Sequence, residues 1–422
     1  MKKTGSVLGK LMIAVLCVIF GVILLENKGI QAAEEGTVRV STQKQLNKAI
    51  KDPDVKTIIF RTQAEIEVKI KAAEEAKTKD IIIDAQNAAV YNKAVFSSVT
   101  LESIGGYYER VSGNDIIVSF DTNYNWFYIG KNKTVNSITV NTTSWNFDGN
   151  YFLGKGAKVK SLNINYTGGE DIVSGVYDPE KNQITIDYTN PDDVNQLITI
   201  TLDKRGQIVK FTSESDNEDY AYSYFKVFDE YGHPVKIIGN SPAGGFYVKL
   251  TDYTPDTKFL KQEVTSEIQT SSVECEYNEK GERISEKSYI VDYVEGEEVI
   301  SGYSYTFDHD EKGHIVKRVF NGTTGERQGQ YEDIKVYNSK GFLISRTEKY
   351  SGDYWDGDDV TFIYTYKYNK AGDLVKQKFQ EGEQYVVIEA TYNELGERSG
   401  IELADIKGDV EDFKNIIQKY MV

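Results

Sequence analysis

Apolar and polar residues alternate along much of this chain, most clearly in its last two thirds. In residues 364–368, with the sequence Tyr-Thr-Tyr-Lys-Tyr, every second residue is aromatic. Side chains of a β-strand point alternately to its two faces, so this pattern predicts strands that bury one face. The 30 tyrosines suit strands with cross-strand aromatic pairs. The chain is therefore expected to be an all-β protein.

A short motif ends most of the alternating segments of residues 169–404. An aromatic or aliphatic residue is followed by Asp or Asn (His309 in one unit), two mostly polar residues, a glycine, a variable residue and an aliphatic run. The Asp or Asn can accept a hydrogen bond from its own downstream backbone, and the glycine takes positive φ without steric cost. The series therefore predicts a sheet of β-hairpin repeats. The glycines are Gly206, Gly232, Gly281, Gly313, Gly341, Gly372 and Gly396.

These glycines lie 26, 49, 32, 28, 31 and 24 residues apart. We interpret the 49-residue gap as two units with a degraded turn near Thr257, and Asn182 as the residue in the glycine position one unit earlier. About 25 to 30 residues are enough for two strands and two turns. Because a lone hairpin is marginally stable, neighbouring units are expected to supply most of the stability.

Residues 34–168 are expected to form a short parallel β-solenoid. It begins with a short helix that carries Leu46, Ala49 and Ile50 on one face and has Ser41 or Thr42 as its N-cap. Six aliphatic clusters follow at steps of about 24, 18, 17, 21 or 22, and 24 residues, a spacing typical of successive coils. The clusters are residues 57–60, 81–83, 99–101, 116–118, 137–140 and 161–164.

Residues 1–33 have the pattern of a targeting segment. Lysines 2, 3 and 10 precede an apolar run over residues 11–25, and small residues follow at 32 and 33. The run is shorter than the roughly 18 residues of a spanning helix, but an uncleaved anchor stays open beside a cleaved signal peptide. We expect export by the Sec route and a secreted or cell-surface location, as in a Gram-positive bacterium.

Charge and cysteine content narrow the choice of partners. Removing residues 1–33 takes away four lysines and Glu26, so the formal charge moves from −16 to −19. Lysines are dispersed among Asp and Glu along the sequence, whereas phosphate binding needs clustered basic residues. We therefore expect no nucleic acid partner, and membrane contact only through the N-terminal segment. Cys275 alone remains, which allows no intramolecular disulfide and predicts a buried thiol.

The N-terminal segments resemble a known superfamily. Residues 40–59, with Val40-Ser41-Thr42, Leu46, Ala49-Ile50 and Val55 to Ile59, are followed by residues 81–85 and 92–96. This series resembles the start of pectate-lyase-like right-handed β-helix proteins, over about 130 residues. The resemblance implies a solenoid capped by a short helix. No acidic cluster recurs at coil spacing as the calcium ligands of the enzymes do, so no catalytic residue is carried over.

The hairpin units resemble the tyrosine-aspartate (YD or RHS-type) repeats of bacterial surface and toxin proteins. Residues 277–284 and 337–343 match the tyrosine, turn, glycine and aliphatic positions. Most units lack the arginine that is common after the glycine in that family. In larger members such repeats wrap into a shell, and about nine units here imply an open curled sheet.

The last segment, residues 405–422, has helical rather than strand periodicity. Its apolar residues recur at intervals of three and four, which predicts an amphipathic helix. Such a helix would cover the last open strand edge or bind a partner. The apolar positions are Ile406, Val410, Phe413, Ile417 and Tyr420.

Candidate chemistry is sparse. The region of His309 and His314 and the acidic residues 353–359 are interpreted as hairpin turns and a charged loop rather than metal sites. No catalytic residue, metal or cofactor is predicted. Exposed aromatic rings beside amides and carboxylates are a common way to bind sugars, with packing between strands as the alternative. The candidate ligand-binding residues are Trp126, Tyr128, Trp145, Tyr354 and Trp355.

Together these features predict a non-enzymatic, exported binding, adhesion or structural protein. Its expected partners are cell-wall or host glycans or other surface proteins. The alternative is a carbohydrate-active β-helix enzyme, a lyase or hydrolase. That hypothesis requires acidic and basic side chains to converge on the solenoid, for example Asp84 and Asp115 with a Lys or Arg. A third possibility is that the repeats are a spacer that holds the solenoid away from the cell.

Overall fold

The computed structural model describes most of the chain after residue 34. The targeting segment 1–33 and the candidate residues Trp145, Tyr354 and Trp355 lie outside the described residues. In the described part, no helix is both long and apolar enough to cross a membrane. The described residues are 35–119, 126–142, 151–168, 171–189, 194–215, 217, 221–241, 245–254, 258–294, 297–324, 327–352 and 359–408.

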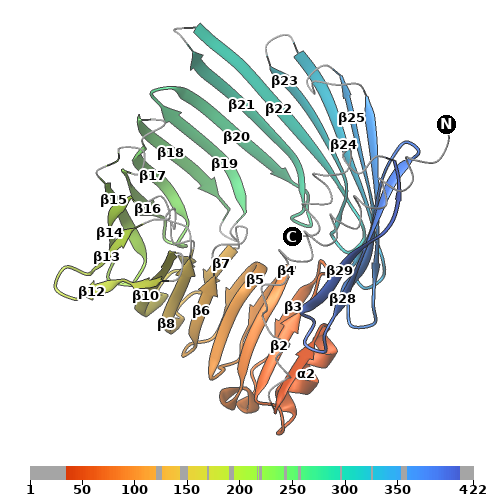
Figure 1. Cartoon of the computed structure of the whole chain (residues 1–422). Helices are drawn as coiled ribbons and strands as arrows, with labels where there is room; N and C mark the ends of the chain where they lie inside the picture. Colours follow the sequence, from red (N-terminus) through yellow and green to blue (C-terminus); the bar gives the residue numbers. More distant parts are fainter. Residues whose placement is uncertain are drawn as a thin grey trace.

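The first part of the chain forms a parallel β-solenoid, as predicted (Figure 1). It contains the helix α2 (Gln43–Lys51) and the short 3-10 helix η1 (Glu74–Thr78). All its strand pairs are parallel except the last, β10 with β11. The strands are β1 (Thr37–Val40), β2 (Thr57–Arg61), β3 (Glu67–Ile70), β4 (Asp80–Asn92), β5 (Ser98–Glu109), β6 (Asp115–Ser119), β7 (Trp126–Ile129), β8 (Thr134–Thr142), β9 (Tyr151–Leu153), β10 (Lys158–Gly168) and β11 (Asp171–Ser174).

All six predicted aliphatic clusters lie in register on one sheet of the solenoid. Directly paired residues are 23, 18, 17, 22 and 24 positions apart, close to the steps expected from the sequence. The pairs run Ile58 with Ile81, Val99, Ile116, Ile138 and Leu162 in turn. Each of these six side chains is at most 5% exposed, so every coil adds one aliphatic layer to a common core.

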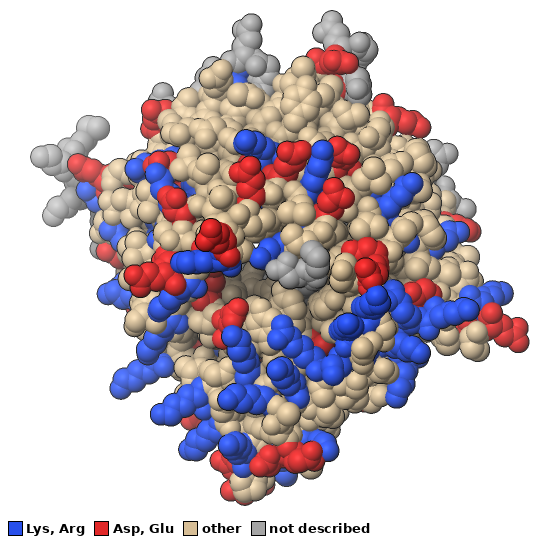
Figure 2. Space-filling view, turned by 180° about the vertical axis from the view of Figure 1, so that it is seen from behind, with Lys and Arg blue, Asp and Glu red and all other residues tan. Residues whose placement is uncertain are grey.

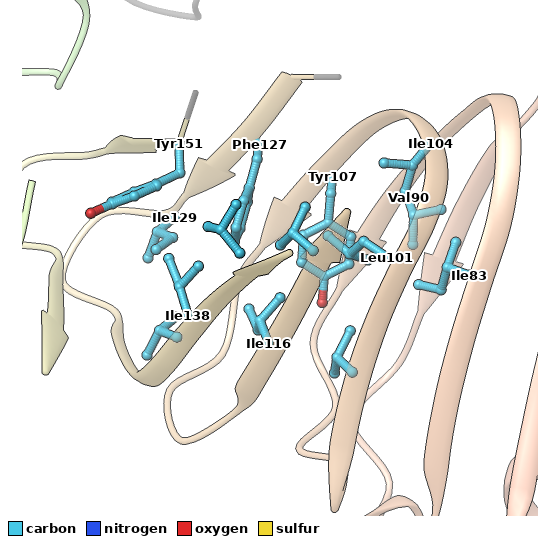
Figure 3. Packing of buried hydrophobic residues seen from close by; sticks show 14 of the residues in the cluster. Ile83, Val90, Leu101, Ile104, Tyr107, Ile116, Phe127, Ile129, Ile138 and Tyr151 are labelled. Atoms are coloured by element: carbon cyan, nitrogen blue, oxygen red, sulfur yellow. The ribbon is translucent and has the colours of Figure 1, made fainter. Parts of the chain in front are cut away.

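A second parallel sheet lies beside the first and shares two of its strands. The first halves of β4 and β5 pair within the first sheet, and their second halves pair with β3 and β7. β7 then pairs with β9. Figure 3 shows how Ile83, Leu101 and Ile116 approach Tyr107 and Phe127 across the space between the two sheets. The solenoid therefore encloses its own hydrophobic core.

Helix α2 caps the start of this core. The N-cap is Thr42, one of the two predicted, and its hydroxyl accepts a hydrogen bond from the backbone N–H of Gln45 at 3.3 Å. Leu46, Ala49 and Ile50 are buried against the first strands, as the spacing predicted. The helix thus closes the first coil to water.

The rest of the described chain is one antiparallel sheet of 18 strands that pair in sequence order. The predicted boundary at residue 168 is close to the change of sheet, which falls after β11. The strands are β12 (Val176–Asp178), β13 (Gln183–Thr189), β14 (Asn195–Leu202), β15 (Ile208–Ser215), β16 (Tyr222–Phe228), β17 (Pro234–Ser241), β18 (Gly245–Tyr253), β19 (Phe259–Ser266), β20 (Gln269–Tyr277), β21 (Arg283–Val294), β22 (Glu297–His309), β23 (Ile315–Thr324), β24 (Arg327–Tyr337), β25 (Leu343–Gly352), β26 (Val360–Tyr368), β27 (Leu374–Glu381), β28 (Gln384–Tyr392) and β29 (Arg398–Lys407).

The turn chemistry predicted from the glycine motif is confirmed. All seven motif glycines have φ between 77° and 94°, and Asn182 has a φ of 55°. In the unit of Gly341, the side-chain oxygen of Asn338 accepts hydrogen bonds from the N–H groups of Lys340 and Phe342. The degraded unit keeps the closing backbone bond, from the N–H of Thr254 to the carbonyl of Lys258 at 2.8 Å.

One detail of the motif was wrong. The motif predicts His309 at the Asp or Asn position of its unit, but Asp310 holds that position and accepts from the backbone N–H of His314 at 3.0 Å. His309 ends strand β22 and pairs with Ile315, so it takes the position that is aromatic or aliphatic in other units. With this change, the unit of Gly313 has its Asp or Asn three residues before the glycine, as the units of Gly232 and Gly372 do.

The hairpin sheet curls round and meets the solenoid near both of its ends (Figure 1). At one end, the carbonyl of Arg205 accepts from the N–H of Val159 at 2.7 Å. At the other end, Arg39 forms a bidentate ion pair with Asp373, and Arg61 donates to the carbonyl of Leu395. The curled hairpin sheet is open, as expected, because its first and last strands do not pair with each other. The solenoid nevertheless bridges its two ends.

The predicted C-terminal helix does not begin at residue 405. Strand β29 continues to Lys407 and pairs with β28, with Tyr385 opposite Lys407. Residues 405–407 are therefore strand rather than helix, because their backbone groups extend the ladder of β28. The remaining positions, from residue 409 onward, lie outside the described residues.

Candidate functional site

One outward-facing row of side chains crosses the second sheet of the solenoid. Cross-strand register places its members directly beside one another on β3, β4, β5, β7 and β9. Their neighbours in sequence, from Ile70 to Leu153, are at most 2% exposed, and alternation along a strand therefore points the row away from the core. We call it the tyrosine row; its members are Lys69, Tyr91, Tyr108, Tyr128 and Phe152.

The middle of the tyrosine row is an ordered stack. The rings of Tyr91 and Tyr108 are stacked with centroids 4.6 Å apart and planes within 13° of parallel. The guanidinium of Arg110 lies 4.5 Å from the centroid of the Tyr91 ring, a cation–π contact. Burial raises the pKa of the Tyr108 phenol to about 12, and the neighbouring Tyr91 contributes. Both phenols are therefore neutral hydrogen-bonding groups at ordinary pH.

A column of basic residues lies beside the tyrosine row, where the strands of the second sheet end. All its members are exposed. Lys155 pairs with Glu230 of the hairpin sheet at 2.5 Å. Figure 2 shows one face of the molecule, whose lower half, formed by the solenoid, carries mostly Lys and Arg, whereas the upper half mixes both charges. We call this set the basic column; its members are Lys71, Lys93, Arg110, Lys131 and Lys155.

A buried carboxylate supports the same corner from inside. Glu109 is fully buried and accepts hydrogen bonds from the Tyr107 hydroxyl at 2.8 Å, from the amides of Asn92 and Asn114, and from the N–H of Val111. Burial raises the pKa of Glu109 to about 7, although these hydrogen bonds oppose the shift. The network fixes the backbone between Tyr108 and Arg110, and so holds both residues of the row and column in place.

Two predicted ligand-binding residues lie in this part of the solenoid. Tyr128 belongs to the tyrosine row, and its hydroxyl donates to the carbonyl of Tyr231 in the hairpin sheet at 3.0 Å. Trp126 is in the same strand and pairs with Gly106. Tyr128 thus contributes to the contact between the solenoid and the hairpin sheet near one end of the tyrosine row. The three other predicted residues lie outside the described part of the chain.

Sequence reasoning missed the central members of the site. The available signal was a repeated pattern in which an outward residue is followed two or three positions later by Lys or Arg. It occurs as Lys69 with Lys71, Tyr91 with Lys93, Tyr108 with Arg110, Tyr128 with Lys131, and Phe152 with Lys155. The coils differ in length from 17 to 24 residues between row members, so the pattern has no fixed period. Only the strand register aligns it.

A second polar cluster lies on the more buried face of the hairpin sheet. Arg346 donates to Asp333 at 2.8 Å and pairs with Glu348 at 2.5 Å. Tyr331 and Tyr364 each donate a hydroxyl hydrogen bond of 2.8 Å to Glu348. Asp333 has a side chain only 1% exposed. Since each carboxylate is held by several donors, this cluster joins strands β24, β25 and β26 and acts as a structural network.

His233 and His314 lie in hairpin turns and contact the turn aspartates. His314 contacts Asp310 through Nδ1 at 2.7 Å, and its Nε2 lies 2.9 Å from the carbonyl oxygen of Glu65 in the solenoid. His233 repeats the contact with Asp229 at 2.8 Å and is fully buried. Among the described residues, no group of His, Cys, Asp and Glu is arranged to hold a metal ion. The turn prediction is confirmed for His314, and the side chains of both His314 and His233 are buried.

The acidic residues of the enzyme alternative do not come together. Asp84 accepts from Arg61 at 2.6 Å, and the same guanidinium lies 3.7 Å from Glu102. Asp115 instead accepts from the hydroxyl of Ser137 on another coil. Arg61 also donates to Leu395, so this ion pair contributes to the docking of the last hairpin.

Cys275 is buried, as predicted, and burial with the nearby charge of Glu286 raises the pKa of its thiol.

Comparison with known proteins assigns no family to this chain. No family model and no curated protein matches the chain. Solved structures with some similarity include TcdB2-TccC3 without its hypervariable C-terminal region (14% identity, TM-score 0.29, covering 55% of this chain) and a porin-like protein from Bacteroides uniformis (10% identity, TM-score 0.14, covering 56% of this chain). The matched region is 14% of the first protein and 94% of the second. The solenoid is present, but these comparisons show no pectate-lyase relative.

Proposed function

We propose that this chain is an exported, non-enzymatic protein of the cell surface or medium that binds glycan chains through the tyrosine row and the basic column. The observation that supports the proposal best is the ordered stack of Tyr91, Tyr108 and Arg110 on the outside of a rigid solenoid. Aromatic rings and hydrogen-bonding groups placed on regular strands are preorganised, which lowers the entropic cost of binding. The hairpin sheet, with its YD-like turns, serves as the rigid support.

The non-enzymatic part of the proposal is supported by the pairing of the solenoid carboxylates. Asp84 is engaged by Arg61, and Asp115 by Ser137, on separate coils. A glycosidase needs two such groups on either side of one bond. The separate positions of Asp84 and Asp115 therefore favour a binding protein over a glycosidase.

A polysaccharide panel tests both parts. The purified chain from residue 34 onward is incubated with neutral and charged polysaccharides, and binding and release of new chain ends are measured separately. We expect binding without release of chain ends. Rapid depolymerisation of any member would replace the proposal with the enzyme alternative, and an absence of binding to every member would leave only a spacer role.

The location is tested independently. Cells of the source organism are fractionated, and the native N-terminus is determined by mass spectrometry. We expect the chain in the medium or wall fraction, either beginning near residue 34 or retaining the apolar segment as an anchor. Recovery of the intact chain from the cytoplasmic fraction would contradict export.

A further inference from the structure

We propose that the ligand of this site is a linear anionic polysaccharide that lies along the solenoid axis, with its charged groups on the basic column. This inference rests on the proposed function and adds the chemical class of the ligand.

Charge is divided unequally between the two parts of the protein. Residues 34–168 carry 17 Lys and Arg against 15 Asp and Glu, whereas residues 169–422 carry 28 against 49. The strongly acidic whole therefore contains a solenoid of slightly positive charge. Folding gathers lysines that are dispersed in the sequence, as Figure 2 shows for one face of the solenoid. A local positive patch on an acidic protein attracts an anion to that patch alone.

Among the described residues, four members of the basic column carry a charge that no ion pair neutralises. Within the part of the chain that the structure describes, Lys71, Lys93, Arg110 and Lys131 form no ion pair, unlike Lys155. They follow one another on successive coils, and neighbouring strands lie about 4.8 Å apart. The five-member column is therefore about 19 Å long. A linear polymer with regularly spaced negative groups can meet several of these cations at once, which gives avidity from individually weak pairs.

The tyrosine stack favours a charged ligand over a neutral one. A neutral sugar usually binds by stacking on the open face of an aromatic ring. The Tyr91 ring is already covered by Tyr108 and by the guanidinium of Arg110. The row therefore offers phenol hydroxyls beside cations, which suit an acceptor-rich anionic chain.

The location also limits the shape of the ligand. The hairpin sheet contacts the solenoid at Glu65, through Gly341, and again at Tyr128, through Tyr231. Tyr91 and Tyr108 lie on the two strands between these contacts. A narrow, flexible chain can enter such a bounded site, whereas a flat membrane would meet the surrounding sheet first.

The test measures binding of the full mature chain to four probes at low and moderate salt. They are a soluble polyuronate, a phosphomannan, a neutral glucan and single-stranded DNA. We expect one or both anionic polysaccharides to bind, with affinity that falls as salt rises. The first two probes distinguish carboxylate from phosphate as the recognised group.

The variant K93Q/R110Q removes two central cations of the column, and we expect it to bind at least tenfold more weakly. The matched control is K48Q/K51Q, which makes the same change in charge at exposed lysines of helix α2. We expect the control to bind as the unmodified chain does. Unchanged thermal unfolding of both variants shows that any loss of binding is local.

The outcomes separate the two proposals. If the neutral glucan binds as well as the anionic chains, and K93Q/R110Q has no effect, the glycan-binding function stands and the anionic inference is wrong. If no polysaccharide binds, both are wrong. If single-stranded DNA binds more tightly than either anionic polysaccharide, the site recognises polyanions in general and the assignment to a carbohydrate is overturned. Equal loss in K48Q/K51Q would place the binding outside the column.

Discussion

The solenoid and the hairpin sheet are both made of short repeated strands, yet they bury apolar surface in different ways. The solenoid folds back on itself, so its aliphatic layers, such as Ile81 and Ile138, are fully enclosed. The hairpin sheet is a single layer, and its first strands complete their burial in the solenoid core through residues such as Ile186 and Phe211. A coil thus carries its own core, while a curled sheet depends on a partner surface and on its turns.

The largest effect should come from truncating the solenoid core. Ile138→Ala removes a side chain that is 0% exposed, and we expect a loss of about 4 kcal/mol in the free energy of unfolding. The same change at Ile363, which is 37% exposed on the hairpin sheet, should cost under about 0.5 kcal/mol. Denaturant unfolding of both variants measures the difference. Similar losses would show that the two regions do not differ in this respect.

The next effect concerns pH. The fold raises the pKa of Glu109 to about 7. The neutral carboxyl group therefore contributes its full stabilisation below the pKa of the unfolded chain, and this contribution is lost as pH rises through 7. The shift corresponds to about 3 kcal/mol less stability at pH 8 than at pH 5 from this group. Glu109→Gln has no such titration, and its unfolding free energy should depend less on pH. A pH dependence identical to that of the unmodified chain would contradict this expectation.

The contact between the two regions gives a smaller effect. A Cβ at Gly232, where φ is 90°, would overlap the carbonyl oxygen of Leu153 in the solenoid. At Gly382, where φ is 54°, a Cβ would meet nothing within 4 Å. Gly382→Ala should cost about 1 kcal/mol from backbone strain alone, and Gly232→Ala about 2 kcal/mol more because the turn must also leave its docking position. Equal losses in thermal unfolding would mean that the docking contributes little.

The smallest effect should come from a single turn. Asn338→Ala removes the side-chain oxygen that accepts from Lys340 and Phe342, and we expect a loss of about 1 kcal/mol. Asn338→Asp keeps the acceptor and should be nearly neutral, so it is the matched control. The comparison of the two variants by denaturant unfolding isolates the hydrogen bonds of the turn from its backbone shape. A loss of stability in both variants would point to the charge rather than the acceptor.

Local chemistry explains why much of the fold could be read from the sequence. Gly206 and Gly372 need only their own backbone angles to mark a turn, and Ile58 and Ile81 need only their spacing to mark coils. The docking of sheet on solenoid was not predictable in this way. Tyr337 donates to the Glu65 carboxylate across 272 positions of sequence, and no local pattern records such a partner.

The candidate site was predicted only at its margin for a related reason. Tyr128 stood out as an aromatic residue near Trp126, while Tyr91 and Tyr108 looked like ordinary strand tyrosines. Their stacking follows from the register of β4 and β5, and the intervening loop sets that register. The lysines seemed dispersed because residues on adjacent coils are far apart in sequence. Thus the periodic core could be predicted, but the outward surface that it supports could not.

The return of the hairpin sheet to the solenoid also restricts how the protein can evolve. An open array of repeats can lengthen or shorten by duplication or deletion of one unit, because each unit contacts only its neighbours. Here Asp373 and Leu395 must meet Arg39 and Arg61, which belong to the first coils of the chain. Gaining or losing one hairpin would displace this junction, unless the number of coils changed with it. The two repeat counts should therefore vary together among descendants of this protein.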